Sequence, residues 1–189
     1  MANLVTLVEY KAYAGIASTN SDTAINSIIP KASQLIKTLC RRNFVDNTST
    51  PIIEVFDGGL GSRHYVKEYP IINVASVEYS LDYGQTFTAS VEYVDYVVNS
   101  TEGYIEAVSG DWPKALKGYR VSYTAGYTTL PEDLKAAALD LVKYYMQNDG
   151  SVHSPKAPGT NSVQIEYITN TALPAHIRRV LDLYVGSFD

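Results

Sequence analysis

The chain has 189 residues, of which 46% are hydrophobic and 19% charged, and its formal net charge is −5. This length and composition suit one folded domain, and they exclude a disordered, charge-rich chain as well as two domains of enzyme size. A protein that grips nucleic acid through its phosphates is also disfavoured, because the longest basic clusters are the pairs Arg41–Arg42 and Arg178–Arg179.

The N-terminus and the single cysteine predict synthesis and folding in a cytoplasm. The first residues lack the basic region, apolar run and cleavage site of a signal peptide, and no apolar stretch is long enough to span a bilayer. Cys40 lies among apolar residues of a predicted helix. We therefore expect a buried structural thiol there, not a disulfide or a multi-cysteine metal site.

Two helices are predicted in the first fifty residues. Thr6 and Glu9 have the spacing of a capping box, which predicts a short helix over about 7–14. Apolar residues then recur at helical spacing over 25–40. Pro30 interrupts this stripe, so we expect either a kink in the preceding turn or a helix that begins only there.

The next part of the chain has short runs of β-forming residues separated by turn residues, a pattern typical of antiparallel strands. Turns that suit positive φ are predicted around Gly58–Gly59, Asp82–Gly84 and Glu102–Gly103. We expect a compact meander or a small barrel. The predicted strands are Ile52–Phe56, His64–Lys67, Val74–Ser80, Tyr93–Val98, Tyr104–Val108 and Tyr119–Thr124.

Helical spacing returns after the strands. Pro131 suits a first helical position and is followed by two acidic residues, which favour a helix N-terminus. Pro174 opens a last helix. Between these helices the sequence predicts a mobile loop over about 148–162 and a short strand over 163–168.

The order of these elements predicts one α+β domain over residues 1–189. N-terminal helices occupy 1–50, the antiparallel β block 51–127, and C-terminal helices 128–189. We therefore expect a small helical bundle, made of two N-terminal and two C-terminal helices, with an inserted antiparallel β block.

Motifs for catalysis or for binding a cofactor or metal do not emerge. The three histidines, His64, His153 and His176, have no metal-ligand spacing, and no Gly-x-Ser-x-Gly elbow occurs. The glycine-rich segment 57–62 precedes a strand pattern, whereas a phosphate loop needs a helix there, so we expect a hairpin turn. We predict no catalytic, cofactor-binding or metal-binding residues and no enzyme activity.

Acidic residues are in excess in the β block, which contains ten Asp and Glu but only five Lys and Arg. We expect these carboxylates on solvated faces of alternating strands. Nothing in the sequence singles out a pair of these carboxylates. Three alternatives therefore remain: a calcium site, a glycosidase pair, or an acid-base hydrolase that uses two of them.

Tyrosine is the unusual feature of the composition, with sixteen in the chain and ten of them between Tyr65 and Tyr127. Tyrosine favours strands, and it is also enriched at protein interfaces, where the ring buries area while the hydroxyl finds a partner. The alternative is a tyrosine-rich β binding module for carbohydrate or a protein receptor. The residues predicted for an interface between subunits are Tyr79, Tyr93, Tyr96, Tyr104, Tyr123 and Tyr127.

Three stretches in order carry a resemblance to a known family. They are Ile28–Phe44 with its closing Arg-Asn-Phe, Glu54–Gly59 followed by the Tyr-Pro-Ile of Tyr69–Val77, and Val121–Tyr127 followed by the Pro-Glu-Asp-Leu of Leu130–Ala138. Together they resemble the head-tail connector proteins of long-tailed bacteriophages, also called adaptor or head-completion proteins.

This resemblance implies a structural virion protein in the neck between head and tail. Such a protein forms a homo-oligomeric ring, commonly of twelve subunits, which docks under the portal protein and helps retain packaged DNA. The ring provides the attachment platform for the stopper or tail-completion protein, and DNA passes through its lumen without sequence-specific binding. No membrane or cofactor is implied.

The resemblance also implies which segment would contact the portal. In the family the C-terminal part typically reaches the portal, and the matching segment here is Leu173–Tyr184. The residues expected to dock are Leu173, His176, Ile177, Arg179, Val180 and Tyr184.

Overall fold

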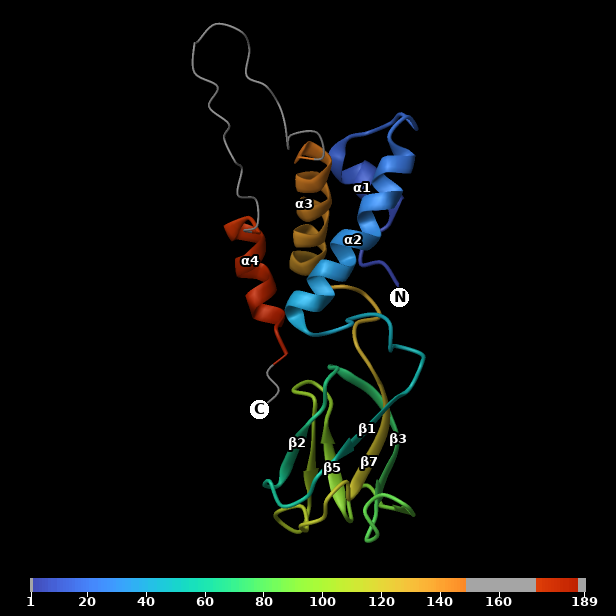
Figure 1. The fold of residues 1–189 in the computed structure, drawn as a ribbon, viewed down its shortest axis with the longest axis vertical. Helices are drawn as coiled ribbons and strands as arrows, with labels where there is room; N and C mark the ends of the chain where they lie inside the picture. Colours follow the sequence, from blue (N-terminus) through green and yellow to red (C-terminus); the bar gives the residue numbers. More distant parts are fainter. Residues whose placement is uncertain (1, 149–172, 187–189) are drawn as a thin grey trace, which may run out of the picture. The chain divides into compact units, whose positions relative to one another are not determined.

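The computed structural model describes residues 2–148 and 173–186 (Figure 1). The chain divides into two compact units. The helical unit consists of residues 3–40 and 131–185, and the β unit consists of residues 1–2, 41–130 and 186–189. Because the strands lie between the two pairs of helices in the chain, the α+β prediction with an inserted β block is confirmed.

The first helix of the helical unit, α1 (Leu7–Ala14), has the predicted capping box. The Glu9 amide donates to Thr6 Oγ1 at 3.3 Å, and the Thr6 amide donates to Glu9 Oε2 at 2.8 Å. These bonds satisfy two amides that a helix N-terminus otherwise leaves without partners. The helix ends at Gly15, whose φ of +67° is a left-handed conformation that favours glycine.

Helix α2 (Asp22–Cys40) runs continuously through Pro30. The expectation that the helix begins only at the proline is therefore wrong. A proline inside a helix removes one backbone hydrogen bond, so packing must offset that loss. The predicted apolar stripe supplies this packing, because Ile25, Ile29 and Ile36 are almost completely buried.

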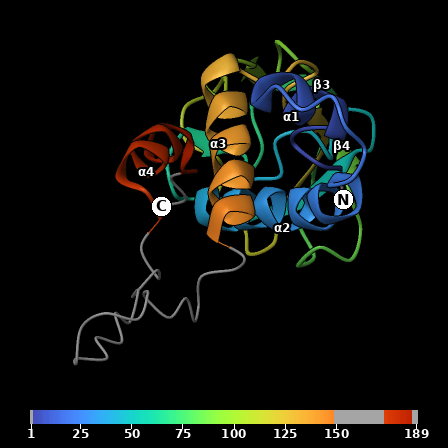
Figure 2. The same ribbon diagram turned by 90° about the horizontal axis from the view of Figure 1, so that it is seen from above.

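Helix α3 (Glu132–Asn148) packs against α1, α2 and α4 (Ala175–Leu181) and is seen between α1 and α4 in Figure 2. A short 3-10 turn, η1 (Asp182–Tyr184), follows α4. Cys40 is buried as predicted, with its Sγ 3.6 Å from the Leu181 carbonyl oxygen. Within the described residues, no helix is long and apolar enough to cross a membrane.

The predicted loop from residue 149 onward and the predicted strand over 163–168 lie outside the described residues.

The β unit contains two antiparallel sheets with the strand orders β1-β7-β3-β4 and β2-β6-β5. The first strand thus pairs with the last, so the simple meander is wrong, although all six predicted strands exist. The strand that was missed, β4, has only two residues, which is too short for alternation to show. The strands are β1 (Ile52–Phe56), β2 (Arg63–Tyr65), β3 (Ile71–Tyr79), β4 (Thr88–Ala89), β5 (Tyr96–Asn99), β6 (Tyr104–Ala107) and β7 (Tyr119–Ala125).

The core of the β unit follows from alternation along β7. Tyr119, Val121, Tyr123 and Ala125 are buried, while the residues between them are partly exposed. This is the period of two expected for a strand with one buried face. Trp112 lies against the Tyr119 ring with centroids 4.8 Å apart, so a loop residue completes this core.

Gly126, directly after β7, is fixed by its surroundings. Its φ is +109°, and its amide donates to the Pro70 carbonyl oxygen at 2.9 Å. A Cβ at this position would lie 2.1 Å from the Phe44 carbonyl oxygen. Only glycine therefore fits between β7 and the segment that follows α2.

We predict that Gly126→Ala destabilises the protein strongly. The matched control is Gly110→Ala, because Gly110 has a φ of +108° but open space around the site of a Cβ. Both variants strain the backbone, but only the first creates a clash, so its free energy of unfolding should be lower by a further ~2 kcal/mol. Urea denaturation measures both values, and equal losses would contradict the role given to the close backbone approach.

Candidate assembly surfaces

A buried arginine anchors the segment after α2 within the β unit. Arg42 is 2% exposed, and its guanidinium carbon lies 3.6 Å from the centroid of the Tyr69 ring, while Nη2 donates to the Tyr69 carbonyl oxygen. The Glu68 carboxylate accepts the backbone amides of Asn43 at 2.6 Å and Phe44 at 3.4 Å. The Arg-Asn-Phe motif noted in the sequence is therefore a structural anchor.

A second buried carboxylate extends this network to β1 and β7. The Glu68 amide donates to the Tyr123 hydroxyl oxygen at 3.2 Å, and the Tyr123 hydroxyl donates to Glu54 Oε1. The Lys67 amide donates to the same Glu54 oxygen at 3.1 Å. Burial raises the pKa of Glu68 and also that of Tyr123. The expectation of solvated carboxylates is thus wrong for Glu54 and Glu68, which are buried and accept hydrogen bonds inside the β unit.

Other carboxylates of the β unit form surface ion pairs. Glu78 pairs with Arg120, and Glu106 pairs with Arg63 at 3.1 Å. No group of three His, Cys, Asp or Glu within residues 2–148 and 173–186 could hold a metal ion.

The glycine-rich segment 57–62 connects β1 to β2, and the amides of its first two glycines are already bonded. The Gly58 amide donates to the Ala115 carbonyl oxygen and the Gly59 amide to the Trp112 carbonyl oxygen, both at 2.8 Å. These amides therefore cannot cradle a phosphate. Because β1 and β2 belong to different sheets, the predicted hairpin is also wrong.

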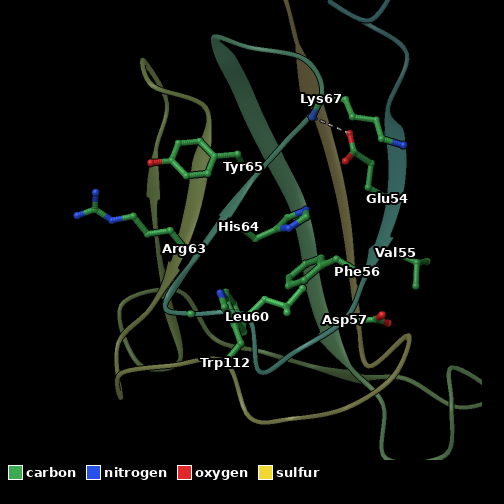
Figure 3. A pocket seen from close by; sticks show the side chains of 11 residues that line it. Glu54, Val55, Phe56, Asp57, Leu60, Arg63, His64, Tyr65, Lys67 and Trp112 are labelled. Atoms are coloured by element: carbon green, nitrogen blue, oxygen red, sulfur yellow. Dashed lines mark hydrogen bonds between the residues drawn. The ribbon is translucent and has the colours of Figure 1, made fainter. Parts of the chain in front are cut away.

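The two sheets present free strand edges to each other, and we call this place the seam. β1 is an edge of one sheet, and β2 is an edge of the other. Neither strand makes a backbone hydrogen bond beyond its single ladder among the described residues. A pocket of about 280 Å³ lies at the seam. Figure 3 shows that Glu54 and Phe56 point toward the β2 segment, whereas Val55 points away.

Aromatic side chains close the inner side of the seam. The rings of Phe56 and His64 are parallel, with centroids 3.7 Å apart. His64 Nε2 and Trp112 Nε1 both line this region and are buried without a hydrogen-bond partner. Burial lowers the pKa of His64 to about 4, since the charged imidazolium cannot be solvated there.

The predicted interface tyrosines do not share one environment. Tyr96, Tyr104 and Tyr123 are buried in the β unit, where they pack in the core. Tyr93 is 78% exposed and Tyr79 is 37% exposed. Tyr127 is half-buried and lies against the Phe44 ring. Of the six predicted residues, Tyr79, Tyr93 and Tyr127 therefore have surface available for a partner.

Two loops beside β4 hold exposed tyrosines in a left-handed backbone conformation. Tyr83 has a φ of +61° and Tyr93 a φ of +65°, which is costly for a bulky side chain. Asp82 holds the first loop, because its carboxylate accepts the amides of Gln85 and Thr86. Hydrogen bonds from the Ser80 and Thr86 hydroxyls, together with these amides, lower the pKa of Asp82.

The second loop is held in a similar way. The Tyr93 amide donates to the Tyr96 carbonyl oxygen at 2.7 Å, and the Asp95 carboxylate accepts the Val91 amide, also at 2.7 Å. Both loops thus present tyrosines on a fixed backbone, an arrangement that reduces the entropy lost when a partner binds.

The predicted portal-docking residues also divide by burial. His176 and Arg179 are exposed, Ile177 is buried in the helical unit, and Leu173 and Val180 are half-buried. The sixth residue, Tyr184, is half-buried too, and its hydroxyl donates to Asp133 Oδ1 at 2.6 Å.

Sequence reasoning missed several exposed apolar residues. Ile53 and Val55 on β1 are 66% and 49% exposed, and Leu81 and Leu183 are also exposed. The carboxylate of Glu54 in β1 was expected on a solvated face. The structure reverses this, because Glu54 points inward while Ile53 and Val55 are exposed. The inward direction of Glu54 depends on its buried partner Tyr123, which lies far along the chain, so no pattern within β1 could have predicted it.

The lowered pKa of His64 predicts a loss of stability in acid. Above pH 6.5 the imidazole is neutral in both states, but between pH 6.5 and about 4 only the unfolded chain takes up the proton. The free energy of unfolding should fall by about 2–3 kcal/mol over that window. His64→Phe should remove this part of the loss, as measured by urea denaturation at several pH values.

The control for this experiment is His176→Gln at the exposed histidine. The acid loss should persist there because His64 is still present. An unchanged pH slope in His64→Phe would contradict the buried, neutral state of this side chain.

No curated protein matches the sequence. Solved structures are similar to it: a chain from the neck of an empty gene transfer agent (GTA) particle, computed with C6 symmetry, has a TM-score of 0.61 at 16% identity, covering 98% of this chain and 91% of that one. A chain from the virion of the native gene transfer agent particle gives the same values.

A chain from the neck of the native GTA particle, computed with C12 symmetry, has a TM-score of 0.58 at 16% identity and covers 100% of this chain and 97% of that one. At this identity the likeness shows the fold. The model of the head completion protein family (HCP) matches residues 3–185. The resemblance seen in the sequence is thereby confirmed, and the chain belongs to the head completion protein family.

Proposed function

We propose that this chain is a ring-forming head-tail connector subunit in the neck of a phage-like particle. It docks under the portal, helps retain packaged DNA and provides the platform for the stopper or tail. The observation that carries this proposal is the family match over residues 3–185. The similar solved chains come from neck structures computed with C6 and C12 symmetry, which supports a ring with one of these symmetries.

The surface of the β unit supports assembly. Monomeric proteins rarely expose large apolar surfaces without a use for them, and here Ile53, Leu81, Tyr83 and Tyr93 are all exposed. In a ring each subunit contacts the next through two different surfaces, so such residues need not lie on one face. We therefore assign contacts between subunits to exposed residues, Tyr79 and Tyr93 among them, and not to the buried tyrosines.

The portal contact is proposed for the exposed positions of α4. His176 and Arg179 are available to a partner, whereas Ile177 could reach one only if the helical unit opened. Leu183, in η1, is a further exposed apolar residue of this segment. A docking surface of His176, Arg179 and Leu183 therefore replaces the larger set suggested by position alone.

The charge of the chain suits a channel that DNA only crosses. Its net charge is −5, and the acidic excess lies in the β block. A basic lumen would hold phosphates and slow the genome, whereas an acidic or neutral one would not. The proposal therefore includes no sequence-specific contact with DNA and no catalysis.

Particles assembled without this chain test the proposal. Their heads should package DNA but then lose it and fail to join tails, and the purified protein should restore both properties when added. Arg179→Glu should restore less than the wild-type protein if α4 contacts the portal, while Lys31→Glu, an exposed change in α2, is the matched control. Normal DNA retention and tail joining without the chain would overturn the proposal.

A further inference from the structure

The pocket at the seam has fixed walls. It lies within the β unit, where β1, the segment 57–62, the β2 segment and Trp112 form it. The Gly59 amide donates to the Trp112 carbonyl oxygen at 2.8 Å, and the Trp112 amide donates to the Gly61 carbonyl oxygen at 3.1 Å. The loop and the tryptophan therefore hold each other in place before any ligand binds, as in most small-molecule sites.

Two buried side chains of this pocket each have a polar atom without a partner. Glu54 is 7% exposed, and its Oε1 accepts the Tyr123 hydroxyl and the Lys67 amide, which leaves Oε2 without a hydrogen bond from the described residues. Figure 3 shows this side chain pointing toward the β2 segment. Trp112 is 5% exposed, and its Nε1, which can only donate, also has no partner there. A ligand that pairs both atoms would remove the cost of burying them unsatisfied.

The charges of the lining favour a neutral ligand. Two acidic and two basic side chains line the pocket: Glu54, Asp57, Arg63 and Lys67. One of each sign is already engaged, because the Asp57 carboxylate accepts the Lys117 amide and Arg63 pairs with Glu106. The remaining carboxylate repels an anion, and the remaining ammonium group repels a cation. The ligand expected is therefore uncharged, with both a donor and an acceptor.

The rest of the lining is aromatic and apolar. Phe56, His64, Tyr65 and Trp112 supply rings, and Leu60 supplies an aliphatic side chain that is 85% exposed. The imidazole is uncharged at neutral pH because burial lowers the pKa of His64 to about 4, and its Nε2 also has no partner. A sugar ring suits such walls, because its hydroxyl groups both donate and accept while its faces carry apolar C–H groups. The pocket volume of about 280 Å³ is just below the usual range for drug-sized ligands and suits a single sugar unit.

We propose that the pocket at the seam binds a neutral sugar unit through Trp112 and Glu54. One hydroxyl group accepts from Trp112 Nε1, and the same or a neighbouring hydroxyl group donates to Glu54 Oε2. This inference goes beyond the connector function. It does not rest on ring formation, because the site uses none of the residues assigned to contacts between subunits or with the portal.

Nuclear magnetic resonance of the full-length protein tests the proposal. Trp112 is the only tryptophan, so its indole N–H gives a single signal. Titration with the methyl glycosides of glucose, galactose and N-acetylglucosamine should shift this signal in a saturable way for at least one of them. Inorganic phosphate, an anion, and N-acetylglycinamide, a neutral amide, should not shift it.

Glu54→Gln tests the carboxylate. The amide oxygen can still accept from the Tyr123 hydroxyl and the Lys67 amide, but an NH₂ group replaces Oε2, so the affinity for the sugar should fall at least about tenfold. Glu92→Gln, at an exposed carboxylate outside the pocket lining, is the matched control and should bind like the wild type. If Glu54→Gln does not fold, as judged by urea denaturation, Trp112→Phe takes its place. That variant keeps a ring but loses the N–H, and calorimetry should show the same loss of affinity.

The opposite results are equally clear. No saturable shift with any of the three glycosides would overturn the inference, and a nuclear Overhauser contact between the indole N–H and water would then assign the pocket to a bound water. A shift caused by phosphate or the amide alone would assign it to another class of ligand. A sugar affinity that the pocket variant leaves unchanged would place the sugar elsewhere. Each of these results overturns the inference and leaves the connector function standing.

Discussion

The buried hydroxyl of Tyr123 is the contact on which the β unit depends. It donates to Glu54 and accepts from the amide of Glu68, whose carboxylate in turn binds the segment beginning at Arg42. Two carboxylates buried without such donors would be strongly destabilising, so the members of this network require each other. The same network accounts for the free edges at the seam. The Glu54 side chain accepts the Lys67 amide, just after β2, so a side chain and not a backbone ladder joins β1 to that segment.

This arrangement suits a protein that works by assembly. The buried carboxylates of the β unit accept hydrogen bonds from groups of the same unit, while loops with fixed backbones present Tyr83 and Tyr93 outward. The chemically notable groups, such as His64 with its unpartnered Nε2, lie inside the fold, where they affect stability. Assembly needs surfaces of this kind, fixed in shape and partly apolar, more than it needs reactive groups.

The sequence predicted the elements well because their signals are local. The capping box at Thr6, the stripe of α2 and the strand runs depend on neighbouring residues and appear where they were expected. The pairing of β1 with β7 and the inward side of Glu54 depend on residues far along the chain, which periodicity cannot reveal. Surface residues were predicted least well, since a tyrosine in a strand has the same pattern whether it fills the core or meets a partner.

Native mass spectrometry of the purified protein, alone and with the portal, tests the central claim most directly. The account predicts a closed homo-oligomer of fixed stoichiometry, with six or twelve copies bound to one portal ring. A protein that stays monomeric at all concentrations and does not bind the portal would contradict it.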